Sequence, residues 1–432
     1  MKIPSLVYAN IKGEIFDHPE LKMSMRSGGY DFMPYESELI PIPANSRLYF
    51  MPQTEAIGFD MTMGGFTTLP DSYAVSVFLP PAYLRLFLPS YKKLDDSVMP
   101  LYAYTAVGWL DDHFVVPAIK VDDDSRWRPD LYDYTESFAP KVEEFLRRFP
   151  DNRLYKQLSR CALEYHCTAA KNVFYPRWEC PMPTSPACNA GCVGCISLQE
   201  SECCPSPQTR LSFMPTPEEI ASVASYHATH AKDPIISFGQ GCEGDPVLAA
   251  DNIAEAITLI RKNLPNLTIN FNSNCSIPEK VEKVIAAGAD SIRVSLNSVI
   301  PSTYNAYYRP KNYTFDDVCR SIEIANERGV YVALNLLMIP GMNDRKSETD
   351  ALIAFMDKYK IDLIQTRNLN IDAELLFKSL NLPHDELLSI KNMLRLIKKK
   401  HPHVKFGYFN RMKRDFQQDR GLPDLKVKKF KK

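Results

Sequence analysis

The segment "PIISFGQGCEGDPVLAADNIAEAITLIRKNLPNLTINFNSN", residues 234–274, decides the fold class because it reads as a strand, a helix and a strand. The runs "PIISFG" and "LTINFNSN" are short and rich in apolar residues, and "ADNIAEAITLIRKN" between them places apolar residues at helical spacing. This order predicts a βαβ unit, whose two strands are parallel.

The same alternation continues on both sides of this segment. Expected helices at 215–231, 277–289, 314–329 and 348–360 alternate with expected strands at 291–298, 330–341 and 361–369. With a first strand near "NVFYPRW", we count about six units. The sequence therefore predicts an α/β fold, a partial (β/α)6 TIM-like barrel over residues 173–370, with functional groups after the carboxyl ends of its strands.

Three further regions surround the expected barrel. Residues 1–150 are rich in Pro, Tyr and Phe and carry short apolar runs between turn-like segments, which predicts a strand-rich α+β N-terminal domain. Apolar residues at helical spacing predict helices at "PKVEEFLRRF", residues 140–149, and "RLYKQLSRCALEYH", residues 153–166. Residues 151–172 therefore predict a helical linker, and residues 371–432 a helical, basic C-terminal region. A chain of 432 residues exceeds the ~250–300 residues of a single core, so more than one domain is expected.

The composition, with 45% hydrophobic and 24% charged residues, is that of an ordinary globular protein. No run approaches the ~18 apolar residues of a membrane span, and no sustained apolar stretch follows Lys2, so we expect neither a membrane segment nor a secretory signal. We expect a cytoplasmic location. In that reducing compartment, clustered thiols are metal ligands or reactive groups more often than disulfides.

The stretch "SPACNAGCVGCISLQESECCPSPQ", residues 185–208, holds five of the eleven cysteines. Its first three, Cys188, Cys192 and Cys195, lie on a short glycine-containing loop directly after the expected first strand. Cysteine thiolates are the ligands of iron–sulfur clusters, and three of them on a four-iron cube leave one iron open. This spacing therefore indicates a [4Fe-4S] cluster with a free coordination site.

Other metal sites remain open at this point. Zinc would need a fourth ligand such as Cys203 or Cys204, but the spacing lacks the paired C-x2-C halves of common zinc sites. A zinc-binding interaction protein is therefore an alternative. A second cluster would draw on Cys161, Cys167, Cys180 and Cys242, although no spacing selects them.

The loop "GQGCEGDP" has two readings. Gly239, Gly241 and Gly244 form a G-x-G-x-x-G pattern between a strand and a helix, as in dinucleotide-binding enzymes. That reading also requires an acidic residue at the end of the next strand, which instead carries Asn272 and Asn274. A Rossmann-type nucleotide-dependent oxidoreductase is the second alternative.

The motif "CNAGCVGC" resembles the C-x3-C-x2-C motif of radical S-adenosylmethionine (SAM) enzymes, and the resemblance covers roughly residues 173–370. It implies that Cys188, Cys192 and Cys195 hold a [4Fe-4S] cluster whose open iron binds SAM. The reduced cluster would cleave SAM to methionine and a 5′-deoxyadenosyl radical, which abstracts hydrogen from an unidentified substrate, such as a peptide, RNA or metabolite. An electron donor such as flavodoxin or ferredoxin is implied as well. The sequence departs from the family at Gly194, where an aromatic residue is usual.

The same resemblance implies SAM contacts on later loops, and no catalytic residue is identified. "GCEGDP" looks like the family's GGEP-type motif, the end of "SIRVSLNS" offers a polar pair, and "NLLMIPGMND" is similar to the glycine-containing motif along the adenine. Strand six adds Gln365, Arg367 and Asn368, which either face substrate or close the sheet, and Arg293 should share the face of the polar pair. The implied SAM contacts are Gly241, Gly244, Asp245, Pro246, Ser295, Asn297, Ile339 and Gly341.

The C-terminal region is strongly basic, with fifteen Lys and Arg against three Asp in residues 391–432. Its basic residues are interleaved with aromatic ones, a pattern that suits RNA because phosphates attract the cations and bases stack on the rings. The alternative is that the region docks on the acidic remainder of its own chain.

Overall fold

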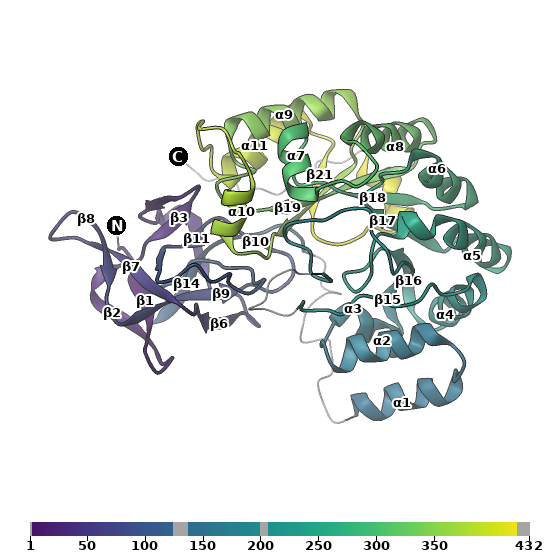
Figure 1. The fold of residues 1–432 in the computed structure, drawn as a ribbon, viewed down its shortest axis with the longest axis horizontal. Helices are drawn as coiled ribbons and strands as arrows, with labels where there is room; N and C mark the ends of the chain where they lie inside the picture. The colour runs from purple at the N-terminus through teal and green to yellow at the C-terminus, as the bar shows by residue number, and fades with distance from the viewer. Residues whose placement is uncertain (1, 124–136, 199–205, 421–432) are drawn as a thin grey trace.

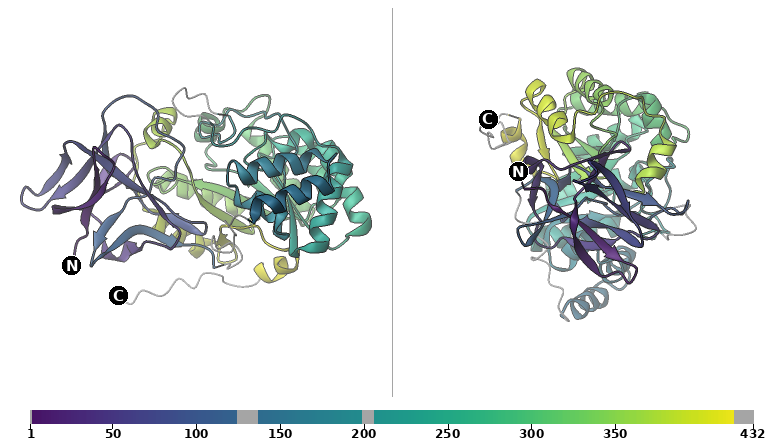
Figure 2. Two further views of the ribbon diagram at one scale, coloured as in Figure 1. Left: turned by 90° about the horizontal axis from the view of Figure 1, so that it is seen from below. Right: turned by 90° about the vertical axis from the view of Figure 1, so that its left-hand side faces the viewer.

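The computed structural model describes residues 2–123, 137–198 and 206–420. They form a β-rich N-terminal part and a larger α/β part, which lie side by side along the long axis of the molecule (Figures 1 and 2). No helix among the described residues is long and apolar enough to cross a membrane.

The N-terminal part consists of short antiparallel strands. Eleven strands share one sheet with the central order β10-β14-β13-β1-β2-β7-β12, and β11, β3 and β4 form a small separate sheet. The predicted strand-rich character is confirmed, and the described residues before 124 contain one short 3-10 turn and no α-helix. The elements are β1 (Ser5–Asn10), β2 (Ile15–Lys22), β3 (Met25–Ser27), β4 (Tyr30–Phe32), η1 (Glu36–Glu38), β5 (Leu39–Pro41), β6 (Arg47–Phe50), β7 (Thr54–Asp60), β8 (Gly65–Leu69), β9 (Ser72–Phe78), β10 (Tyr83–Arg85), β11 (Leu88–Pro89), β12 (Tyr91–Lys93), β13 (Gly108–Leu110) and β14 (His113–Lys120).

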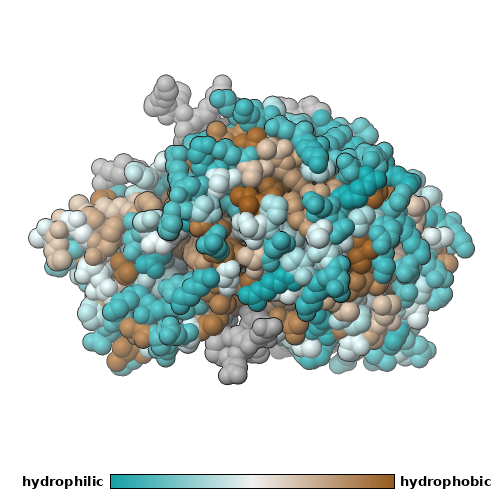
Figure 3. Space-filling model, turned by 45° about the horizontal axis from the view of Figure 1, so that its top comes forward, coloured by the Kyte–Doolittle hydropathy of each residue, from teal (hydrophilic) through white to brown (hydrophobic). Residues whose placement is uncertain are grey.

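Many apolar side chains of the N-terminal part are exposed on short strands and turns. Met63 is 72% exposed, Ile11 70% and Tyr30 61%. Brown side chains accordingly interrupt the polar surface at the left of Figure 3, where these strands lie. Small strands that are covered on one face only cannot bury every apolar residue.

Three helices follow and pack beside the first barrel strand: α1 (Phe138–Arg148), α2 (Arg153–Leu163) and α3 (Thr168–Phe174). α1 and α2 confirm the helices expected at 140–149 and 153–166, and α1 lies at the end of the range assigned to the N-terminal domain. α3 takes up residues that we assigned to the first strand, because Val173 and Phe174 are buried in a helix whose neighbours include Phe138 and Phe145. The strand therefore begins later, at Arg177.

The α/β part is built on a curled parallel sheet of seven strands in the order β15-β16-β17-β18-β19-β20-β21. The partial TIM-like barrel is confirmed, with one strand more than predicted because the C-terminal region adds the short β21 beside β20. A strictly sequential order also lacks the reversal at which Rossmann folds bind nucleotides. The strands are β15 (Arg177–Met182), β16 (Lys232–Phe238), β17 (Thr268–Ser273), β18 (Ser291–Ser295), β19 (Tyr331–Met338), β20 (Leu363–Asn368) and β21 (Lys405–Gly407).

Helices cover the outer face of this sheet (Figure 1). Their ends follow local sequence signals: α4 and α8 begin with capping boxes at Thr216 and Thr314, and α6 ends at Gly288 in the left-handed conformation. The elements are α4 (Pro217–His230), η4 (Pro246–Ala249), α5 (Ala250–Asn263), α6 (Pro278–Ala287), α7 (Pro301–Tyr308), α8 (Phe315–Glu327), α9 (Lys346–Lys358), α10 (Ala373–Ser379), α11 (Ile390–Lys400), η5 (Lys413–Asp415) and α12 (Phe416–Asp419).

The basic C-terminal region docks on the barrel through ion pairs, as the second of our two interpretations predicts. Lys413 lies 2.7 Å from Asp290, Arg414 2.6 Å from Asp233, and Arg420 2.8 Å from Asp362. Residues 421–432, which carry the last lysines, lie outside the described residues.

The same region closes the amino-terminal end of the barrel. Phe416 stacks on Tyr331 with ring centroids 4.1 Å apart, and both side chains are buried with Ala333 and Leu363.

The two parts of the molecule meet at the carboxyl ends of β19 and β20. The guanidinium of Arg85, which is 1% exposed, donates to the backbone oxygens of Met338 and Leu369, and the Arg85 amide donates to the Asn368 side chain. Gly341 and Gly28 touch so closely that a Cβ on Gly341 would lie 2.0 Å from the Gly28 nitrogen. The N-terminal part therefore sits against the functional end of the barrel.

Candidate functional site

The three motif cysteines follow β15 on one loop at the carboxyl end of the barrel, as predicted. Backbone hydrogen bonds tie this loop to α7, from Gly191 to Tyr308 and from Val193 to Tyr307. Cys188, Cys192 and Cys195 are each half-buried. The thiols therefore project from a fixed backbone and stay accessible to a ligand.

A buried carboxylate joins this loop to the loop after β16. One oxygen of Glu243 accepts from the amides of Thr184 and Ser185 at 2.7 and 2.8 Å, and the other accepts from the amide of Gln240 at 2.7 Å. Burial nevertheless raises the pKa of Glu243 to about 7. Sequence reasoning missed this residue, although a glutamate inside a glycine-rich loop was a visible signal.

The predicted SAM-binding loop, residues 241–246, packs directly on the cysteine loop. The amides of Gly244 and Asp245 donate to the oxygens of Ser185 and Ala187 at 2.7 and 2.9 Å. A Cβ on Gly244 would lie 1.9 Å from the Ala187 oxygen, so only glycine permits this approach.

The Asp245 side chain is fully engaged by the protein. It accepts hydrogen bonds from the hydroxyl of Ser273 and from the amides of Asn274 and Val247. Pro246 follows as the first residue of η4. Asp245 therefore fixes the backbone of this loop and connects the loop to the end of β17.

Gly194, the departure from the family motif, has an aromatic neighbour from elsewhere in the chain. The Tyr307 hydroxyl lies 3.0 Å from where a Gly194 Cβ would be, and it hydrogen-bonds the Gly194 backbone. A ring from α7 thus occupies the space beside the third cysteine, which sequence reasoning could not show because 112 residues of chain separate the two.

The donor set fits an iron–sulfur cluster. Burial raises the pKa of Cys188 to about 11 and that of Cys192 further, so these thiols stay protonated until cations bind them. The Arg210 guanidinium lies 3.7 Å from the Cys195 sulfur and adds positive charge there. Among the described residues, no three His, Cys, Asp or Glu side chains form a group that could hold a metal ion. In a [4Fe-4S] cluster each cysteine sulfur binds a different iron, so the three cysteine sulfurs need not converge on a single metal ion.

The zinc and second-cluster alternatives gain no support from the described cysteines. Cys161 and Cys242 hydrogen-bond each other in the core, and Cys180 is buried in β15. Cys203 and Cys204 lie outside the described residues.

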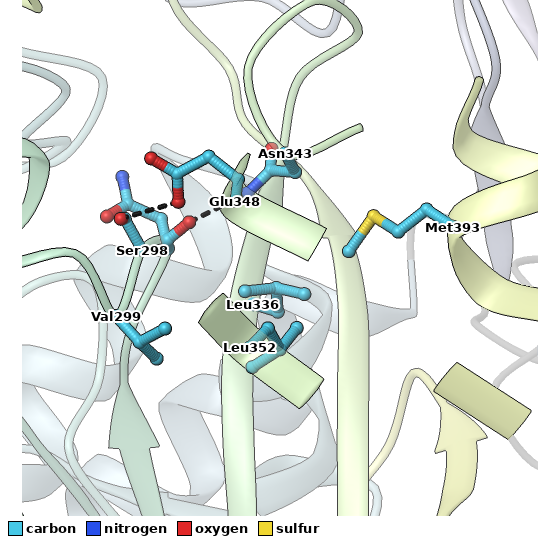
Figure 4. A pocket seen from close by; sticks show the side chains of 8 residues that line it. Ser298, Val299, Leu336, Asn343, Glu348, Leu352 and Met393 are labelled. Atoms are coloured by element: carbon cyan, nitrogen blue, oxygen red, sulfur yellow. Dashed lines mark hydrogen bonds between the residues drawn. The ribbon is translucent and has the colours of Figure 1, made fainter. Parts of the chain in front are cut away.

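Ser295 and Asn297, the predicted polar pair, lie in different surroundings. Ser295 ends β18 on the half-buried inner face of the sheet. Asn297 is 1% exposed, and neither polar atom of its side-chain amide has a partner among the residues that the structure describes. It lines a cavity of about 10 Å³, the size of one water, together with Ser298, Asn343 and Glu348 (Figure 4).

The predicted adenine loop after β19 is folded on itself. Ile339 donates to the Asn343 side chain at 2.8 Å and Gly341 to Asp344 at 2.7 Å, and both are buried. Gly341 has φ +92°, which favours glycine. This loop lies where the N-terminal part meets the barrel.

Polar side chains also line the inner face of the later strands. Arg293 of β18 donates to Gln365 of β20 at 2.9 Å, and Gln365 donates to Asn410 at 2.8 Å. Asn410 in turn donates to Glu179 of β15 at 2.6 Å, so this chain of hydrogen bonds links the first strand of the sheet to β18 and β20. Sequence reasoning missed Asn410, because it reaches the barrel interior from a region that we expected to be helical.

Comparisons with known proteins agree with this geometry. Residues 182–353 match the family model of the radical SAM superfamily. A probable GTP 3′,8-cyclase of Methanosarcina acetivorans is 28% identical over 192 residues, 44% of this chain and 54% of that protein. The FeMo cofactor biosynthesis protein NifB of Klebsiella pneumoniae is 24% identical over 177 residues, 38% of this chain and 37% of that protein.

Among solved structures, the FeFe-hydrogenase maturase HydG of Carboxydothermus hydrogenoformans covers 66% of this chain and 74% of its own, with 15% identity and a TM-score of 0.39. The chain spans about half the length of the cyclase relatives that it matches. By its cysteine motif, its parallel barrel and the family-model match, residues 182–353 of this chain form a domain of the radical SAM superfamily, whose members use a [4Fe-4S] cluster and SAM.

Proposed function

We propose that this protein is a radical SAM enzyme that cleaves SAM reductively at a [4Fe-4S] cluster held by Cys188, Cys192 and Cys195. The observation that carries the proposal is the position of this loop at the carboxyl end of the first barrel strand, fastened to the loop after the second strand. When bound, the reduced cluster supplies the electron that splits SAM into methionine and the hydrogen-abstracting 5′-deoxyadenosyl radical.

The protein's own residues would hold the [4Fe-4S] cluster and SAM next to each other. The loop with Gly241, Gly244, Asp245 and Pro246 offers backbone groups beside the cysteines. Ser295 and the turn containing Ile339 and Gly341 lie at the ends of later strands, where the nucleoside end of SAM would extend. Asn297 is the weakest SAM contact of this set, because its amide lines the small cavity.

The remaining parts of the proposal concern surroundings and partners. An external electron donor such as flavodoxin or ferredoxin reduces the cluster, and a cytoplasmic location keeps the thiols reduced. The N-terminal part shapes substrate access, since Arg85 fixes it at the carboxyl ends of β19 and β20. The ion pairs of the C-terminal region favour a structural role for it over RNA binding.

Anaerobic reconstitution tests this function. Iron content, the EPR spectrum of the dithionite-reduced protein with and without SAM, and 5′-deoxyadenosine by chromatography would be measured for the wild type and for a Cys188/Cys192/Cys195→Ala triple variant. We expect about four irons per chain, a signal that changes with SAM, and loss of all three properties in the triple variant.

A Cys319→Ala variant is the matched control, because this half-buried cysteine lies on the outer helix α8. It should behave like the wild type. Stoichiometric zinc without iron, or an intact EPR signal in the triple variant, would reject the proposal.

A further inference from the structure

Two arginines project from the inner face of the barrel without a carboxylate partner. Arg293 comes from β18 and Arg367 from β20, on the side of the sheet opposite the buried Val294 and Ile364. Neither forms an ion pair with any residue in the described part of the chain, although buried or half-buried arginines are normally paired.

Most of the hydrogen-bond donors of these two side chains remain available. Arg293 donates from Nη1 to the neutral Gln365, and Arg367 donates from Nη2 to the Tyr408 backbone oxygen at 3.0 Å. The Nε of each arginine is buried and has no partner in the described part of the chain. A guanidinium carries five N–H groups, so each side chain has donors without an acceptor among the described residues.

The local charge is in excess. The positive charge of Arg367 adds to burial in lowering the pKa of Arg293 to about 9, so the two guanidinium groups repel each other. Glu179 is the carboxylate that acts on Arg293, and its Oε1 accepts from Asn410 instead. Within residues 2–123, 137–198 and 206–420, two cations therefore face one engaged carboxylate.

Both arginines keep partial solvent exposure on the inner face of the barrel. Arg293 and Arg367 are half-buried, as are Ser295, Asn335 and Leu337 on the same inner face, whereas their neighbours on the outer face are buried. The opposite end is closed by Tyr331 and Phe416. A site of this form suits a small molecule that enters through the mouth of the barrel.

We propose that Arg293 and Arg367 bind an oxyanion, a carboxylate or phosphate group, of a small-molecule substrate. This inference rests on the proposed function and adds the substrate class. Planar guanidinium groups match the oxygens of both anions in bidentate geometry, and an anion would neutralise the charge excess.

The anion belongs to the substrate and not to SAM. The loops that would hold the amino-acid end of SAM are tied to β15, β16 and β17. Arg367 lies on β20 and is followed by Asn368, which bonds the N-terminal part at Tyr83. The two anionic groups would thus lie on different sides of the barrel.

Calorimetric titration of the reconstituted full-length protein tests the inference. Inorganic phosphate, pyrophosphate and succinate are the probes, with wild type compared with Arg293→Lys, Arg367→Met and the double variant. Loss of one charge-assisted contact should weaken anion binding about 10–100-fold, and high salt should weaken it in the wild type. Preference for succinate or for the phosphates identifies the oxyanion.

Arg320→Met is the matched control, since Arg320 is exposed on α8 and pairs with Glu323. In this control, anion binding, SAM affinity and the slow release of 5′-deoxyadenosine without substrate should stay unchanged, and circular dichroism should show that all variants are folded. Arg293→Lys keeps the positive charge but loses the bidentate geometry of the guanidinium group. It therefore tests the inference by itself if Arg367→Met does not fold.

Absence of anion binding by the wild type, unchanged binding by the double variant, or a parallel loss of SAM affinity would overturn the inference. Binding of single-stranded RNA in preference to the small anions would overturn it too. Arginine-dependent anion binding by a protein that never cleaves SAM would instead reject the proposed function alone.

Discussion

The cysteine end of the barrel and the inner face of its later strands treat their polar groups differently. After β15 and β16, Glu243 and Asp245 are each surrounded by donors from the protein. On β18 and β20, Arg293 and Arg367 keep buried nitrogens without a partner among the described residues. A site that is fully formed before its ligand binds has its buried polar groups paired within the protein. A site that its ligand completes leaves such groups unpaired until the ligand binds.

The largest effect is expected from removing the Glu243 carboxylate, which links the loops after β15 and β16. Glu243→Ala leaves the amides of Thr184, Ser185 and Gln240 without their acceptor in a buried place. We expect a loss of about 3–5 kcal/mol in the free energy of unfolding and poor iron incorporation. Urea denaturation and iron analysis measure both, and Glu243→Gln, which keeps an acceptor, should lose less than half as much. An unchanged midpoint in Glu243→Ala would show that the fastening contributes nothing.

A smaller effect is expected where the loops touch. Gly244→Ala places a methyl group against the Ala187 oxygen, so the backbone must move, at about 2–3 kcal/mol. Thermal unfolding and the EPR signal of the reconstituted cluster would be compared with Gly65→Ala, whose added Cβ meets nothing within 4 Å. Equal stability of the two variants would mean that the loops separate freely.

The pH dependence of stability also tests the cysteine end of the barrel. Because burial raises the pKa of Glu243 to about 7, from 4.5, the folded state holds a proton that the unfolded state loses between these values. This group therefore makes stability fall as pH rises from 4.5 to 7, by about 1–3 kcal/mol. The difference between wild type and Glu243→Gln in urea midpoints at pH 5 and pH 7.5 isolates the effect, and a constant difference would contradict it.

The smallest effect is expected at Asn297. Its side-chain amide has no partner in the described part of the chain, so Asn297→Ala removes no hydrogen bond seen there and should change stability by less than about 1 kcal/mol. With a water in the cavity as the partner of the amide, SAM affinity should change less than about twofold. Equilibrium binding of SAM to this variant and to Ser295→Ala measures the contrast. A tenfold loss of SAM affinity in Asn297→Ala would instead make this amide a strong SAM contact.

The sequence by itself determined the elements whose signals are local. Residues 234–274 fixed a βαβ unit through their periodicity, and Cys188, Cys192 and Cys195 fixed the cluster motif through their spacing. The family resemblance followed from the cysteine motif, and the partial barrel followed from the same strand–helix alternation over residues 173–370.

The tertiary structure decided every feature that depends on residues far apart in the chain. Tyr307 beside Gly194, Asn410 inside the barrel, and the short β21 all reach their places through packing that no periodicity encodes. The same holds for the arginines, because a sequence shows the charge of Arg293 and Arg367 but not whether a carboxylate lies opposite. Local patterns reflect the preferences of consecutive residues, whereas partners in space are set by how the strands and loops finally pack.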